Sequence, residues 1–101
     1  MNIGRQVNEL AKQLDQLNQK MKELQGQAVA AYTPLVEEVC SRQVTQNEVE
    51  CMLDLLLPYA EDDRILSLFK RVCRSYWDIY PDSITFYIME YRKEYETGNQ
   101  A

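Results

Sequence analysis

The first third of the chain carries an unbroken heptad repeat of apolar residues, and this repeat constrains the fold more than any other feature. Its members are separated by alternating steps of four and three residues. We call them the seam, which consists of Ile3, Val7, Leu10, Leu14, Leu17, Met21 and Leu24. A 3.5-residue repeat keeps one narrow stripe of a helix facing a partner helix. Ala28 and Ala31 continue the stripe with smaller side chains.

The residues that flank the seam are mostly polar and uncharged. They are Gln6, Ala11, Gln13, Asn18, Lys20 and Gln25. Because a helix in a globular core normally carries a wider apolar face, the narrow stripe favours pairing with another molecule. The alternative is that this helix folds back onto the C-terminal helices of its own chain. Leucine dominates the seam and no asparagine interrupts it, so the seam specifies neither a strand number nor a parallel or antiparallel direction. The nearly neutral flanks do not select the partner either.

The rest of the chain predicts a small helical bundle of about four helices, so the fold class is all-α. Thr33 and Pro34 resemble an N-cap followed by the first residue of a helix that ends near residue 43. Pro34 could instead kink one long helix, and both alternatives stay open. Thr45 and Glu48 form a capping-box pattern that predicts the start of the next helix, which ends before Pro58.

Two more helices are predicted after Pro58. Acidic residues at 61–63 begin the first, which runs to about residue 80 and is expected to be central to the bundle. Its wide apolar face consists of Ile65, Leu68, Phe69, Val72, Cys73, Tyr76, Trp77, Ile79 and Tyr80. The last helix follows Pro81 and carries a stripe of Ile84, Tyr87, Ile88, Tyr91 and Tyr95. We assign Tyr87 and Tyr91 to the core and leave Tyr95 open.

These patterns divide the chain into a heptad helix at 1–33, a helical bundle at 34–97 and a frayed tail at 98–101. A bundle of this size buries only about 60% of the surface that its unfolded chain exposes. It would therefore be marginally stable alone, which is a second reason to expect association.

The composition excludes several kinds of chemistry. The chain contains no histidine, so a Ser-His-Asp triad or a zinc site with histidine ligands cannot form. Cys40, Cys51 and Cys73 form no Cys-x-x-Cys pair, and their apolar neighbours suggest small buried side chains kept reduced in the cytoplasm. We therefore predict no catalytic residue, no metal site and no cofactor. No apolar run approaches the ~18 residues that span a bilayer, so no membrane association is expected.

Charge is distributed unevenly along the bundle. Residues 34–63 hold eight carboxylates and one arginine, a net charge of −7, whereas residues 64–80 hold four cations and one carboxylate, a net charge of +3. The four cations are Arg64, Lys70, Arg71 and Arg74. They could contact nucleic acid, but the chain carries −5 overall and would repel phosphates elsewhere. We expect instead that they pair with neighbouring acidic residues.

The sequence thus predicts a non-enzymatic, cytoplasmic interaction module that self-associates through the seam. A homodimer is the default because most oligomers are symmetric homo-oligomers. The bundle would then be presented to a protein partner whose identity the sequence does not contain. The alternative is a small dimeric regulator that binds nucleic acid through the four cations.

Overall fold

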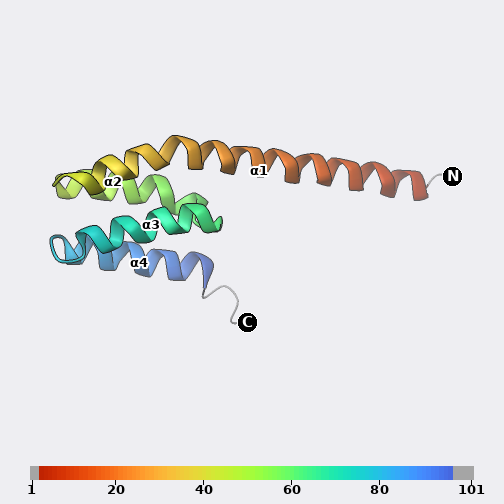
Figure 1. Cartoon of the computed structure of the whole chain (residues 1–101). Coiled ribbons are helices and arrows are strands. Elements are labelled where there is room, and N and C mark those ends of the chain that lie inside the picture. Colours follow the sequence, from red (N-terminus) through yellow and green to blue (C-terminus); the bar gives the residue numbers. More distant parts are fainter. Residues whose placement is uncertain (1–2, 97–101) are drawn as a thin grey trace.

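The computed structural model describes the backbone of residues 3–96 and the side chains of residues 9–96. It confirms the all-α fold class: within that range every regular element is a helix. The elements are α1 (Ile3–Ser41), α2 (Gln46–Leu56), a short 3₁₀ helix η1 (Leu57–Tyr59), α3 (Asp63–Tyr76) and α4 (Pro81–Tyr95). Figure 1 shows α2, α3 and α4 stacked beside the C-terminal part of α1, whose N-terminal half extends beyond the stack. The predicted frayed tail, 98–101, lies outside the described residues.

Helix α1 runs without interruption through Pro34, so the alternative of a single long helix is the one observed. Proline removes one backbone hydrogen bond and crowds the preceding turn. The Thr33 hydroxyl does not cap a new helix. It donates a hydrogen bond to the Val29 carbonyl at 2.6 Å, and bonds of this kind often bend helices. Figure 1 shows α1 curving, with the bundle on its concave side.

The core begins on α1 itself, at Ala28 and Val36, and not at a separate helix that starts at Pro34. The central helix is α3, as predicted, because it packs against α1, α2 and α4. Its buried residues include Ile65 and Phe69. From α4, Ile84 and Tyr87 are buried, and the rest of the predicted stripe (Ile88, Tyr91 and Tyr95) packs half-buried against the same core. Four helices therefore form the bundle, and the first of them is the C-terminal part of α1.

Two side chains assigned to the apolar face of the central helix are exposed in the structure. Helix α3 ends at Tyr76, four residues earlier than predicted. A proline disfavours helical backbone at the residue before it, and Tyr80 has φ −128° and ψ 63°. The chain turns between Tyr76 and Pro81, so Trp77 and Ile79 point to solvent with exposed fractions of 48% and 44%.

The cysteines also differ from the prediction that all three are buried. Cys73 is buried in the core and Cys40 is half-buried, but Cys51 is exposed. The reason is its register on α2, where Val49, Met52 and Leu56 face the core and Cys51 lies on another side.

Candidate self-association surface

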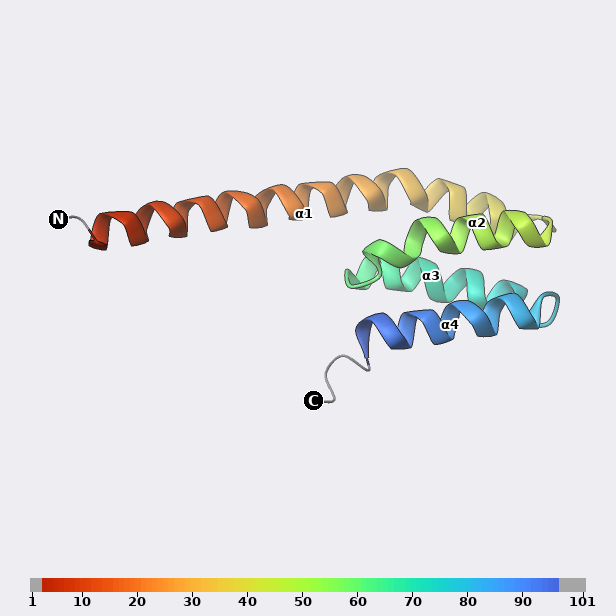
Figure 2. The same cartoon turned by 180° about the vertical axis from the view of Figure 1, so that it is seen from behind.

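The N-terminal half of α1 extends away from the bundle as a single helix, and both views show it without a neighbouring element (Figures 1 and 2). Every side chain from Glu9 to Leu24 is exposed. From Ile3 to Leu24 this segment is about 33 Å long at ~1.5 Å per residue. An isolated helix of this length is marginally stable in water, so the segment benefits from a partner.

The described members of the seam are solvent-exposed. The exposed fractions are 58% for Leu10, 61% for Leu14, 59% for Leu17, 57% for Met21 and 52% for Leu24. Ile3 and Val7 lie on the backbone of α1, but their side chains are outside the described residues. A helical period of 3.6 residues places the five described side chains on one side of α1. They form a continuous apolar stripe over the part of the helix that lacks a neighbour.

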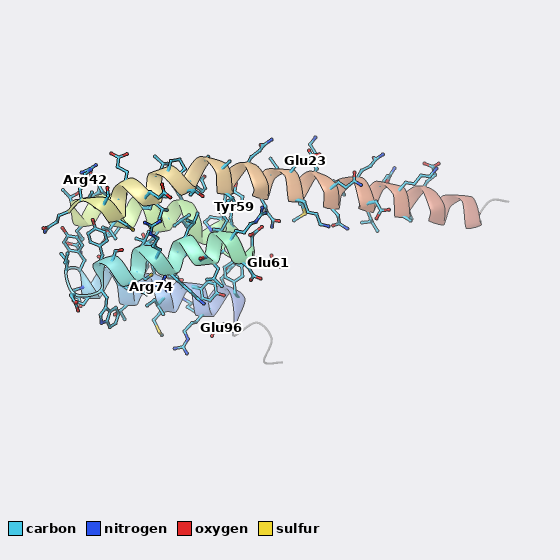
Figure 3. All side chains as sticks on the ribbon, viewed as in Figure 1. Glu23, Arg42, Tyr59, Glu61, Arg74 and Glu96 are labelled. Carbon is cyan, nitrogen blue, oxygen red and sulfur yellow. The ribbon has the colours of Figure 1, made fainter. Side chains whose placement is uncertain are left out.

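The stripe starts where the bundle ends. Met21 and Gln25 of α1 line a shallow depression with Glu61 and Asp62, which lie in the connection between η1 and α3. One turn further, Ala28 is already buried. Figure 3 shows Glu61 and Tyr59 at the end of the bundle from which the N-terminal half of α1 extends. The seam therefore lies on the side of α1 that meets the bundle further along the helix. Most of its residues lie in the part of α1 that extends past the end of the bundle.

The four predicted cations have different neighbours in the structure. Arg64 is bound at the start of α3, where its guanidinium lies 2.8 Å from a carboxylate oxygen of Asp62. Arg71 approaches Glu37 of α1 at 4.0 Å. Lys70 and Arg74 border a groove between α3 and α4. For Arg64 and Arg71, the structure agrees with the expectation that the cations lie beside acidic residues.

The pair of Asp62 and Arg64 stabilises the start of α3. Asp62 is the N-cap residue, and its carboxylate accepts a hydrogen bond from the Arg64 amide at 2.8 Å. The hydrogen bond from the Arg64 side chain, followed by this backbone bond, lowers the pKa of Asp62 to about 2. The Asp62 carboxylate therefore stays ionised at all but strongly acidic pH. Arg64 thus has an anionic partner within the chain.

Between α3 and α4 lies a groove with a volume of about 400 Å³. Its floor contains Phe69, Ile88 and Tyr91. Lys70, Arg74, Arg92 and Glu96 stand at its rim, and Figure 3 marks Arg74 and Glu96. Cys73 also lines the groove, but burial raises the pKa of its thiol to about 11, which disfavours the reactive thiolate.

Sequence reasoning missed the role of the tyrosine hydroxyls. Tyr95 donates to the Leu57 carbonyl at 2.7 Å, and Tyr80 donates to the Val44 carbonyl at 2.7 Å. Tyr87 donates to the Asp54 carboxylate at 2.6 Å, and burial together with this bond raises the pKa of Tyr87. Helical spacing indicated that these rings pack on the core, but only the folded arrangement brings the distant acceptors within reach.

Comparison with known proteins adds no family or function to this geometry. A scan against protein-family models, a search of curated proteins and a search of solved structures each found no match. Within the described residues, no helix combines the length and the apolar character that crossing a membrane requires.

Proposed function

We propose that the protein is a non-enzymatic interaction module that self-associates through the seam. The observation that carries this proposal is the exposure of five large apolar side chains in one continuous stripe. Monomeric soluble proteins rarely expose a large contiguous apolar patch, and such patches commonly mark interaction sites. The stripe has the heptad spacing that allows two helices to pack side chain against side chain.

The bundle supplies the second part of the proposed function, which is to present a surface to a protein partner. Trp77 in the α3–α4 connection is 48% exposed, and Phe86 and Met89 on α4 are 56% and 52% exposed. Aromatic residues and methionine are enriched at protein interfaces. Arg64 and Arg71 lie beside the carboxylates of Asp62 and Glu37. The alternative of nucleic-acid binding therefore has less support than the interaction module, because nearby carboxylates oppose the binding of phosphates.

The proposal is tested by placing a charge in the seam. Leu17→Asp should weaken the dimer at least about 100-fold, because each dimer loses two leucine contacts of ~1.5–3 kcal/mol. The matched control is Leu55→Asp, which changes an exposed leucine of α2 that lies outside the seam and is 44% exposed. Light scattering reports the mass of each variant. The proposal fails if the unchanged chain is already monomeric at tens of micromolar, or if Leu17→Asp and Leu55→Asp dissociate alike.

A further inference from the structure

The position of the bundle on α1 restricts how two copies can pair. The seam continues in register from Leu24 to Ala28, and the next heptad positions are Ala31 and Leu35. Over this stretch the bundle covers part of the stripe. Ala28 is buried and Ala31 is exposed, while Leu35, which is 43% exposed, lines a groove with Met52 and Leu55 of α2. Between them, the Tyr32 ring lies 6.3 Å from the Tyr59 ring of η1.

A parallel pair of α1 helices therefore conflicts with the bundle, which already covers Ala28 and Tyr32. In a parallel coiled coil each seam faces the partner over its whole length, and the helix axes lie about 8–10 Å apart. Beyond Leu24 the partner helix would enter the space that α2 and η1 occupy. By symmetry, the second bundle would enter the same space from the other side. An antiparallel pair confines this conflict to the two ends of the paired segment, because each bundle then lies at an opposite end.

We infer that the partner of the seam is a second copy of this chain, bound antiparallel about a two-fold axis between Asp15 and Gln16. This inference rests on the proposed self-association and adds its direction and register. Leu14 then packs against Leu17 of the partner subunit, and Leu10 packs against Met21 of the partner subunit. Leu24 lies opposite position 7 of the partner and Ala28 lies opposite position 3, so the first turn of the partner's α1 reaches the end of the bundle. Leu10, Leu14, Leu17 and Met21 are then covered by one another.

Lys20 is the single charged residue among those that flank the seam, and it supports this register over the registers one heptad away. With the axis between Asp15 and Gln16, Lys20 lies nearest to Gln13 of the partner subunit, a pair without repulsion. A shift of one heptad towards the bundle brings Lys20 against Lys20 of the partner subunit, and like charges in such positions destabilise a helix pair. A shift in the other direction leaves Leu24 uncovered. The sequence of the seam is thus complementary to itself in one antiparallel register.

Disulfide cross-linking tests the direction and the register. A mixture of full-length Leu14→Cys and Leu17→Cys chains should give a disulfide between the two variants, because these positions face each other. Neither variant alone should cross-link above the background that the unchanged chain gives through Cys40, Cys51 and Cys73. Self-linking of Leu17→Cys in preference to the mixed pair would indicate parallel helices and would overturn the inference. A dimeric mixture without the mixed disulfide would overturn the register.

A second measurement leaves the seam intact, in case the cysteine variants weaken the dimer. Spin labels are placed at Asp15→Cys or Glu23→Cys in a full chain whose native cysteines are replaced by alanine. In the antiparallel pair, the two labels are offset along the axis by ~1.5 Å at position 15 and by ~22 Å at position 23. The label-to-label distance should therefore be clearly longer at position 23. If the protein is dimeric and the two distances are equal, the antiparallel pairing is wrong but self-association stands. If the protein is monomeric, the proposed function itself is wrong.

Discussion

The hydroxyl of Tyr76 connects three backbone groups around the end of α1. It accepts a hydrogen bond from the Val44 amide at 3.2 Å, and the carbonyls of Val39 and Arg42 both lie 2.6 Å from it. The last carbonyls of a helix have no partner within the helix, so an outside donor must satisfy them when they are buried. The side chain is 2% exposed. A single side chain of α3 thus stabilises the turn that directs the chain from α1 into α2.

We predict that Tyr76→Phe lowers the free energy of unfolding by about 1–3 kcal/mol, because it leaves the Val44 amide without its acceptor. Tyr91→Phe is the control: this ring packs half-buried against the core, and its hydroxyl has no hydrogen-bond partner among the described residues. Its removal should change stability by less than about 0.5 kcal/mol. Urea unfolding measures both variants, and equal effects would contradict this role of the Tyr76 hydroxyl.

At the level of single residues, the sequence predicted burial better than it predicted hydrogen bonding. Tyr87 was correctly assigned to the core, because a stripe at helical spacing depends only on neighbouring residues. Trp77 was wrongly assigned, because its direction depends on where α3 unwinds before Pro81. The acceptors of Tyr76, Tyr80 and Tyr95 lie more than 30 residues away, so no local pattern could indicate them.

Among the helices, α2 has the start that the sequence specified most clearly. Thr45 accepts a hydrogen bond from the Glu48 amide at 3.2 Å, and the Glu48 carboxylate accepts one from the Thr45 amide at 3.0 Å. The capping box is therefore confirmed, and it needs no tertiary contact because both partners lie within one turn. Val44 and Val49, on either side of it, are both buried in the core.

We predict that Thr45→Ala lowers the free energy of unfolding by about 1 kcal/mol, since one amide of the first turn loses its acceptor. Thr85→Ala provides the matched control, because Thr85 is exposed in the interior of α4. Alanine is the better helix former there, so this change should stabilise by up to about 0.7 kcal/mol. Thermal or urea unfolding would contradict the capping role if both variants shifted stability in the same direction.

The local sequence could not decide the course of α1 at Pro34. A threonine followed by proline is typical of a helix start, and the same pair occurs inside long helices that bend. In the structure, Ala28 and Val36, on either side of Pro34, are both buried in the same core. Packing on both sides thus stabilises a continuous helix, and such packing was not predictable before the neighbouring helices were placed.

The whole molecule is elongated, 64 Å in its longest dimension, because one helix belongs to the bundle over only part of its length. The heptad spacing predicted the seam and its apolar character from local sequence alone. The direction of pairing was not predictable in the same way. The antiparallel direction that we propose is argued from where α2 and η1 pack on α1, which is a property of the tertiary fold.

The most direct test of the central claim, that another copy covers the seam, is amide hydrogen exchange at increasing protein concentration. Exchange over residues 10–24 should slow as the concentration rises, because pairing stabilises a helix segment that otherwise opens locally. Exchange over α2 should slow much less, because the bundle already protects its core. Rates over residues 10–24 that stay the same from low micromolar to high micromolar concentration would contradict the claim.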